Sequence, residues 1–385
     1  MSALTRVLLG LGTLLVLFAI YLGYQRLTSN DLELKLSSAE PFGIRFAILD
    51  DRNENQLEAL AQVVVWPEEK RALLYFVNTH ARHEVDDDAI RKLSPRSADR
   101  FADFTEVSND YYLTVNRSQA VRLLDLLDGV TLIVEESQEF PNSRFQYPRG
   151  VRFYPGEQIL EYALSERTLE KDPSRFYLNT IEKLYRTESM ILNLYWRLDE
   201  FREKLGHADL SAFAAGLVDS NLNAEELASL FEFLNLENEV HLSVLEVPME
   251  IVKNPKPRRQ DLLLVNPKRG RVVFREFKEN LRAGRLKTDL FPIDVLNGTE
   301  VGGLARRVKQ FLQDRGLQVL DADNYPHKPL TKSFIVSRSG DTYVTTRLMQ
   351  ITALEATRVV FGRTVLDVDA SFIIGADFDT KQLRL

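Results

Sequence analysis

The stretch DYYLTVNRSQAVRLLDLLDGVTLIVE, residues 110–135, contains a strand, a helix and a second strand in direct succession. Its first part, YYLTV, is rich in the aromatic and β-branched side chains that favour strands. In the middle part, Val121, Leu124 and Leu127 recur at the spacing of one helix face. Gly129 then ends the helix before the strand VTLIVE begins. A strand–helix–strand unit of this kind predicts a domain of the α/β class.

Segments on both sides of this unit support the same class. Three strand-like segments precede it and one follows it, at residues 42–49, 61–66, 71–77 and 240–247. Helical periodicity covers residues 156–167, 174–205, 210–217 and 224–234. These elements predict one large domain, to which we assign residues 42–285.

The last hundred residues carry a second pattern. We expect strands at residues 291–296, 317–322, 333–338 and 371–378, and helices at residues 304–316 and around 347–361. The order β-α-β-β-α-β is that of a split βαβ, or ferredoxin-like, fold. It predicts a small C-terminal domain, residues 286–385, with apolar faces of its own that let it fold alone.

Composition narrows the class of protein. With 385 residues, 44% of them hydrophobic, the chain is long enough for two packed domains. A net charge of -7 argues against nucleic acid as a partner, because phosphate binding needs a basic face. The absence of cysteine excludes disulfides and thiolate metal sites. His80 and His83 precede an acidic run at residues 84–88, which lacks any known ligand spacing and is interpreted as a solvated loop.

The N-terminus predicts a membrane anchor. Residues 7–24, VLLGLGTLLVLFAIYLGY, carry no charge and are long enough to cross a bilayer as a helix. Bulky residues stand where a signal peptide would have its small cleavage-site residues, so we expect the segment to be retained. Residues 1–6 would then be a cytoplasmic tail and residues 25–41 a stalk. A buried hairpin helix of a soluble protein is the alternative.

Several motifs resemble those of the LytR–CpsA–Psr family. In the C-terminal domain these are VLNGT at residues 295–299, GLA at 303–305 and IGADF at 374–378, which resemble the LytR C-terminal domain. In the first domain they are DYYLTV leading into LLDLLDGV, and GVRFYPGEQILEYA at residues 150–163. The resemblance covers residues 43–205 and 290–378, and implies an α/β domain with a central mixed sheet.

The resemblance also implies a location and an activity. Members of the family transfer glycopolymers from a polyprenyl pyrophosphate lipid to peptidoglycan or a related acceptor. Their acidic residues bind Mg²⁺ and their arginines hold the pyrophosphate, as expected for hard cations and planar guanidinium groups. We therefore expect a single-pass protein of the bacterial cytoplasmic membrane, with its bulk outside the cytoplasm. Polyprenyl-linked glycan, peptidoglycan and envelope-assembly proteins are the implied partners.

The family's functional residues are only partly present. Asp50 and Arg52 match its D-x-R motif, Glu58 replaces an aspartate, and Asp172 and Arg175 match a later D-x-x-R. The resemblance thus implies Asp50 and Glu58 as candidate Mg²⁺ ligands. It implies Arg52, Asp172 and Arg175 as candidate ligand-binding residues. Other motif positions, which hold arginine, an acid or glutamine in the family, hold unrelated residues here, namely Gln56, Asn78, Thr79, Leu164, Glu166, Leu178 and Asn179.

These losses favour a divergent, non-catalytic scaffold or binder of an envelope lipid or glycan. We assign no catalytic residue, and treat Asp50, Arg52 and Glu58 as remnants. The alternative is an active phosphotransferase in which other arginines compensate, with candidates at Arg82, Arg149, Arg152 and Arg167. A transcription regulator is disfavoured by the anchor and by the lack of a helix-turn-helix. We expect the lipid tunnel of active relatives to be a filled core here.

Overall fold

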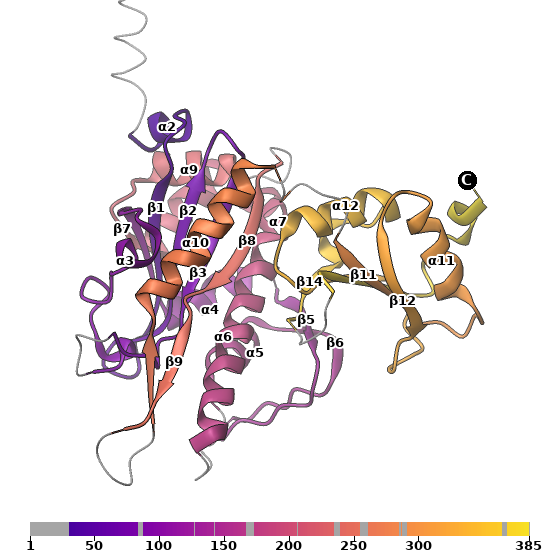
Figure 1. Ribbon diagram of the computed structural model, residues 1–385, viewed down its shortest axis with the longest axis horizontal. Coiled ribbons are helices and arrows are strands. Elements are labelled where there is room, and N and C mark those ends of the chain that lie inside the picture. Colours follow the sequence, from indigo (N-terminus) through magenta and orange to yellow (C-terminus); the bar gives the residue numbers. More distant parts are fainter. Residues whose placement is uncertain are drawn as a thin grey trace, which may run out of the picture.

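The computed structural model describes residues 31–384 apart from residues 84–87, 127, 142, 167–172, 206, 235–238, 255–260, 285, 287–290 and 364–367. The expected anchor, residues 7–24, lies outside this range. Among the residues that are described, no helix is both long and apolar enough to cross a membrane. Figure 1 shows a larger unit built around a central sheet, and a smaller C-terminal unit beside it.

The central sheet has six strands in the order β7-β4-β1-β2-β3-β8. Their bounds are β1 Phe42–Asp50, β2 Gln56–Trp66, β3 Arg71–Val77, β4 Asn109–Asn116, β7 Asp219–Ser220 and β8 His241–Glu246. Strand β2 pairs antiparallel with both β1 and β3, whereas β1 pairs with β4, and β3 with β8, in parallel. The prediction of an α/β domain with a mixed sheet is therefore confirmed.

Helices cover both faces of this sheet. Every residue of β3 is buried, as expected for a strand enclosed on both sides. Leu73 and Tyr75 point to the face covered by α3 (Ala102–Thr105) and α10 (Pro267–Arg282). Ala72 and Leu74 point to the face covered by α6 (Pro173–Tyr195). Helices α2 (Asp31–Leu36), α4 (Arg117–Leu126), α5 (Gly156–Leu164), α7 (Leu198–Leu205), α8 (His207–Leu217) and α9 (Ala224–Phe233) complete the unit.

The strand–helix–strand unit of residues 110–135 forms as expected, but its second strand leaves the central sheet. Strand β5 (Val130–Val134) pairs antiparallel with β6 (Gly150–Tyr154) in a separate two-stranded sheet. A second hairpin joins β9 (Met249–Val252) to β10 (Leu262–Val265), directly before α10. The β5–β6 sheet extends toward the C-terminal unit (Figure 1).

The C-terminal unit is not ferredoxin-like. Its sheet has five strands in the order β12-β11-β15-β13-β14. The elements are β11 Pro292–Asn297, α11 Leu304–Gln313, β12 Gln318–Asn324, β13 Phe334–Ser337, α12 Thr342–Thr352, β14 Val359–Phe361 and β15 Ala370–Ile374. The helix expected to reach Phe361 ends at Thr352, because Ala353 adopts a left-handed conformation. The β-branched Val359 and Val360 then form a strand, which gives two parallel βαβ units on either side of β15.

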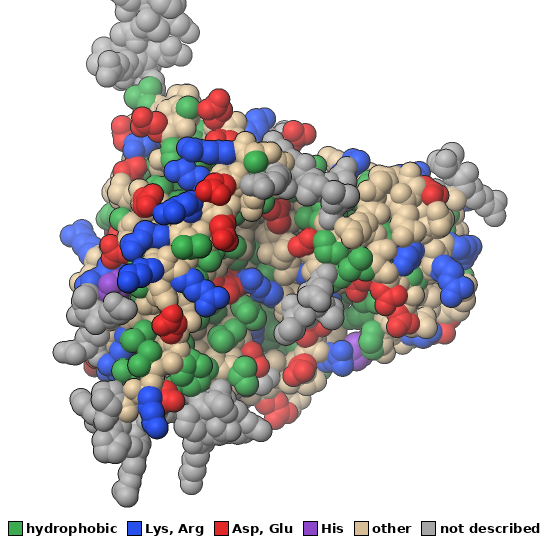
Figure 2. Space-filling view, in the orientation of Figure 1, with side chains coloured by type: hydrophobic (Ala, Val, Ile, Leu, Met, Phe, Trp, Pro, Cys, Tyr) green, Lys and Arg blue, Asp and Glu red, His purple; other side chains and the backbone are tan. Residues whose placement is uncertain are grey.

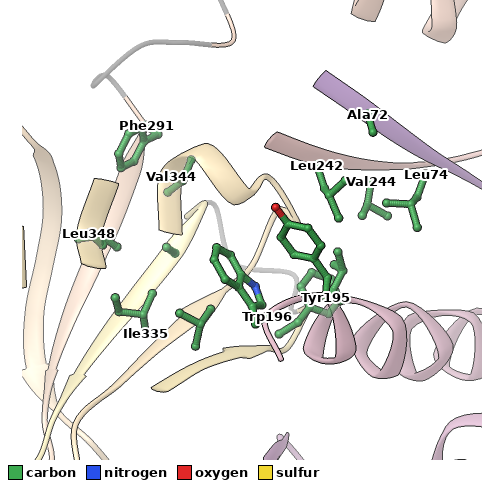
Figure 3. Close-up of a cluster of buried hydrophobic side chains, with 14 of the residues drawn as sticks. Ala72, Leu74, Tyr195, Trp196, Leu242, Val244, Phe291, Ile335, Val344 and Leu348 are labelled. Atoms are coloured by element: carbon green, nitrogen blue, oxygen red, sulfur yellow. The ribbon is translucent and has the colours of Figure 1, made fainter. Parts of the chain in front are cut away.

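The two units share a hydrophobic core (Figure 3). One buried cluster contains side chains of the central sheet, such as Leu242, and of the C-terminal unit, such as Ile335. It also includes Tyr195, the last residue of α6, and the adjacent Trp196. Arg71 is fully buried and donates to both carboxylate oxygens of Asp341 at 3.0 Å. The interface is therefore both apolar and ion-paired. Independent folding of residues 286–385 stays a prediction.

Candidate functional site

An apolar cavity of about 270 Å³ lies between the central sheet and helices α4, α6 and α9. Only aliphatic and aromatic residues line it, among them Ile48, Val63, Ala120, Met190 and Phe231. The expectation of a filled core is therefore wrong. A hollow and a core require the same residue types, so the sequence pattern cannot separate them.

A small polar hollow adjoins this cavity. Its volume is about 10 Å³, which is close to the space that one water requires. Ile48 lines the cavity, and its cross-strand partner Ala59 lines the polar hollow. On α6, Met190 lines the cavity, and Thr187, about one turn away, lines the polar hollow. The polar hollow therefore lies at one end of the apolar cavity.

A β-bulge directs Glu58 into this hollow. Ile48 pairs with Ala59 and Leu49 with Leu57, so Glu58 is the extra residue on β2. A bulge re-aims a side chain and is common beside functional sites. The Glu58 side chain is mostly buried, and its Oε2 lies 2.5 Å from the Nζ of Lys183 on α6.

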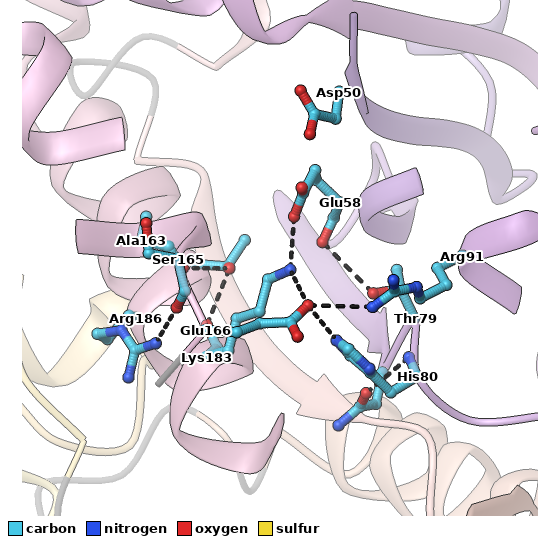
Figure 4. Close-up of polar contacts among 12 residues, drawn as sticks. Asp50, Glu58, Thr79, His80, Arg91, Ala163, Ser165, Glu166, Lys183 and Arg186 are labelled. Carbon is cyan, nitrogen blue, oxygen red and sulfur yellow. Dashed lines mark hydrogen bonds and ion pairs between the residues drawn. The ribbon is translucent and has the colours of Figure 1, made fainter. Parts of the chain in front are cut away.

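Three more side chains continue this contact (Figure 4). Lys183 Nζ also lies 3.6 Å from Glu166 Oε1. The same Glu166 oxygen is 3.1 Å from Arg91 Nη1 and 2.9 Å from His80 Nε2. We call Glu58, His80, Arg91, Glu166 and Lys183 the Lys183 cluster. Its two carboxylates face two permanent cations, so the cluster is neutral without any ligand.

Electrostatics fix the protonation of the two central partners. Burial raises the pKa of Glu166, but the hydrogen bond from His80 and the charges of Lys183 and Arg91 outweigh this and bring it to about 2. Burial lowers the pKa of His80, and Glu166 opposes this shift only in part. Glu166 is therefore ionised and His80 neutral at pH 7. This burial also corrects the interpretation of His80 as part of a solvated loop.

Arg186 faces the same region but has a structural role. Its Nε and Nη2 donate at 2.7 Å to the carbonyls of Tyr162 and Ser165, at the end of α5. Its guanidinium also lies 5.0 Å from the centre of the Phe140 ring. Basic side chains commonly satisfy the last carbonyls of a helix in this way. Lys183 and Arg186 are three residues apart on one helix face, which is the sequence signal that could have revealed both.

The predicted site residues are only partly brought together. Asp50 is buried at the end of β1, and its Oδ1 accepts from the backbone N of Arg52 at 3.1 Å. The Arg52 side chain is mostly exposed, with its Nε 3.5 Å from the same oxygen. Asp172 lies outside the described residues, and Arg175 lies in α6 with its side chain not described.

The described residues do not form a metal site of the expected kind. No group of three or more carboxylate or histidine side chains within the described part of the chain could hold a metal ion. Of the two candidates, Glu58 is already held by the ammonium of Lys183. One carboxylate oxygen of Glu58 is therefore already engaged by an internal cation.

Arg117 is a candidate that the sequence analysis missed. It begins α4 directly after β4, is buried, and lies in the electrostatic field of Asp50, Glu58 and Arg52. Burial, and next the charge of Arg52, lower its pKa. Its side chain makes no hydrogen bond or ion pair with the described residues. Among the arginines whose side chains are described, Arg52 and Arg117 are therefore still available to an anion here.

Comparisons with known proteins agree with the motifs. Residues 291–378 match the family described as LytR cell envelope-related transcriptional attenuator. The chain is also 26% identical over 147 residues to the polyisoprenyl-teichoic acid–peptidoglycan teichoic acid transferase TagU of Halalkalibacterium halodurans. This match covers 35% of the chain and 48% of the relative, so it spans about half of the relative's length.

Solved structures share the fold. Bacillus subtilis TagV superposes with a TM-score of 0.50 at 16% identity, over 64% of this chain and 98% of TagV. A protein from Streptococcus agalactiae superposes with a TM-score of 0.51 at 14% identity, over 66% of this chain and 91% of that protein. The resemblance to the LytR–CpsA–Psr family is thus confirmed, with a LytR C-terminal domain at residues 291–378.

Proposed function

Because the chain is related to the LytR–CpsA–Psr proteins, we propose that it is a membrane-anchored envelope protein that binds a polyprenyl-linked lipid without transferring its glycan. The observation that carries this proposal is the apolar cavity beside a neutral polar cluster. The cavity supplies a site for hydrocarbon, and the cluster supplies little charge to activate a pyrophosphate.

The cavity is suited to a branched hydrocarbon chain. Apolar protein cavities of roughly 150 Å³ stay dry and bind molecules such as benzene. A cavity of about 270 Å³ has room for more than one isoprenyl unit. Each methylene group transferred from water contributes about 0.8 kcal/mol to binding.

The polar cluster argues against transfer. Lys183 and Arg91 are engaged by Glu58 and Glu166, so a bound pyrophosphate would compete with one buried and one half-buried internal ion pair. Among the described side chains, Arg52 and Arg117 remain available. Removing a single transition-state donor typically lowers a rate about 10²–10³-fold. With Asn78, Thr79, Leu164 and Glu166 at the family's charged positions, we expect no measurable transfer.

An active glycopolymer phosphotransferase is the second candidate. Arg52 pairs with Asp50, and Arg117 lies in the electrostatic field of Asp50 and Glu58, which leaves two guanidinium groups and two carboxylates in one region. The purified chain should be assayed for transfer from a polyprenyl pyrophosphate donor with Mg²⁺. Turnover that disappears in both Asp50→Ala and Arg52→Ala would establish this alternative and refute the first.

Lipid binding is tested by filling the cavity. Ala120→Phe places a ring among the lining residues and should displace about two methylene groups of the ligand. At about 0.8 kcal/mol each, binding of a fluorescent polyprenyl phosphate would weaken about 10-fold. Ala102→Phe, on the exposed side of another helix, is the matched control. Equal affinities for all three proteins would contradict the proposal.

The anchor is tested separately. Residues 7–24 should place the N-terminus in the cytoplasm and the bulk of the chain outside it. A reporter that fluoresces only in the cytoplasm, fused after Leu385, should stay dark. Strong fluorescence from an intact fusion would refute this topology.

A further inference from the structure

A basic groove lies on the face of the molecule opposite the apolar cavity. It has a volume of about 200 Å³ and runs between α3 and α10, with Phe104 and Phe274 at its floor. Arg271, Arg275, Lys278 and Arg282 of α10 line one side. Figure 2 shows Lys and Arg side chains gathered along α10 on this face.

The four cations form one row along the helix. They are separated by four, three and four residues, which places them on the same helix face. At 1.5 Å per residue, neighbours are offset by about 5–6 Å along the axis, and the row spans roughly 16 Å. The buried side of α10, with Phe274, Phe277 and Leu281, packs on the central sheet. The row is therefore held rigidly.

These charges are not neutralised as those of the Lys183 cluster are. Within the described part of the chain, Arg275, Lys278 and Arg282 make no ion pair. Arg271 uses one nitrogen to donate to the carbonyl of Asp103 at 2.8 Å. Two carboxylates, Glu106 and Glu279, also line the groove, which leaves an excess of two positive charges in a chain whose net charge is -7.

We propose that this groove binds a linear polyanion with one phosphodiester per short repeat, such as a poly(glycerol phosphate) chain. Guanidinium groups suit phosphate oxygens because they can donate two parallel hydrogen bonds. A row of evenly offset cations matches a row of evenly spaced anions. The groove lies across the sheet from the lipid cavity, so this proposal does not depend on the proposed function.

The shape of the groove decides between possible occupants. A concave channel admits a narrow chain, whereas a bilayer surface is flat and would meet only the rim. Single-stranded nucleic acid is usually held by aromatic rings on which bases stack. Phe104 and Phe274 are only 3% exposed each, so their faces are not available for stacking. A polymer without bases fits these features best.

The test uses the full-length protein in a neutral detergent and a fluorescently labelled poly(glycerol phosphate) oligomer. We expect Arg275→Gln/Lys278→Gln to weaken binding about 10-fold at low salt. The slope of log affinity against log salt should fall by about 1.4, or about 0.7 for each lost phosphate contact. Arg306→Gln/Arg307→Gln, an equal charge change on the exposed side of α11, should leave both quantities unchanged.

Three outcomes would overturn the proposal. Equal losses in both double variants would indicate attraction by overall charge alone. Binding of short-chain phosphatidylglycerol in place of the polymer would identify a lipid headgroup site. Tighter binding of a single-stranded oligonucleotide of equal charge would identify a nucleic-acid site. The substituted side chains are exposed, or half-buried in the case of Lys278, and unchanged circular dichroism confirms that the variants fold.

Discussion

Two ion clusters lie along α6, five residues apart, and they are balanced differently. In the Lys183 cluster two carboxylates face two permanent cations. In the second cluster, at the domain interface, Glu188 of α6 and Glu246 of β8 share a single cation, Arg363 of the C-terminal unit. Glu188 is fully buried, with its Oε2 3.1 Å from Arg363 Nη1. The charges of the Lys183 cluster balance, whereas the interface cluster has one carboxylate more than it has cations.

The two clusters differ in how their buried carboxylates are stabilised. A buried ion pair is stable only when each charge has a partner, and an unpaired buried carboxyl takes up a proton instead. Burial, and next the charge of Glu246, raise the pKa of Glu188 well above its usual value, which Arg363 only partly offsets. The Lys183 cluster should therefore be insensitive to mild pH change. The interface should respond to pH.

The largest expected effect comes from breaking the balance of the first cluster. Lys183→Met leaves Glu58 and Glu166 without their shared cation in a mostly buried position. Removing one partner of a buried pair typically costs about 3–5 kcal/mol in the free energy of unfolding. Urea denaturation at pH 7 measures this loss. Lys92→Met, which removes an exposed partner of Asp88, is the control and should cost less than about 0.5 kcal/mol.

A double variant sharpens this result. Adding Glu58→Gln to Lys183→Met removes one of the two uncompensated carboxylates. Part of the lost stability should therefore return, because the change removes a buried charge. A double variant that is less stable than Lys183→Met by the full cost of another lost ion pair would mean that Glu58 and Lys183 act independently. The cluster would then not be a unit.

The sequence predicted the elements better than it predicted the site. The repeating apolar positions of α4 and α6 and the buried strands of the central sheet are set by local periodicity, which a single sequence shows. Helix α10 was missed even though Asn266 caps it and Pro267 begins it, which are the usual start signals of a helix. Strand β14 was missed because three residues are too few to show a period.

The site depends on contacts between distant residues, which periodicity does not show. Lys183 meets a carboxylate 125 positions away, and Arg117 reaches the site only because α4 starts where β4 ends. The bulge that aims Glu58 inward needs the register of two strands to be known. Motif comparison found Asp50, Arg52 and Glu58. It gave no sign that Lys183 neutralises Glu58.

The second prediction concerns the interface cluster. A carboxyl whose pKa is raised by folding contributes stability at low pH, and this contribution is lost as pH rises from the usual 4.5 through the raised pKa. The free energy of unfolding of the native protein should therefore decline above about pH 5. In Glu188→Gln this decline should be smaller, because glutamine stays neutral. Glu182→Gln, on the same helix with a more exposed side chain, should keep the native slope. Parallel slopes for all three proteins would mean that Glu188 does not hold the proton.

The third prediction concerns Glu166 and has the opposite sign. Its pKa is lowered from 4.5 to about 2, so its contribution is present above pH 4.5 and is lost as pH falls toward 2. Glu166→Gln should cost about 1 kcal/mol at pH 7, a value that allows for its partial exposure. The variant should then lose less stability than the native protein between about pH 4.5 and pH 2. Equal acid denaturation curves would contradict the low pKa.

The smallest expected effect is that of Mg²⁺ on the native protein. Lys183 already neutralises Glu58 at 2.5 Å, so a divalent cation would have to displace an internal ammonium and would meet, among the candidate ligands, only Asp50 in addition. Ligand binding raises the melting temperature only when the native state binds the ligand. We therefore expect a few millimolar Mg²⁺ to shift Tm by less than about 1 °C beyond the shift caused by NaCl of equal ionic strength, which controls for screening.

In Lys183→Met the ammonium is gone, and the freed carboxylates should let Mg²⁺ raise Tm more than in the native protein. A clear increase in the native protein, absent in Asp50→Ala, would show that the remnant acids hold a metal despite Lys183, and would favour the transferase.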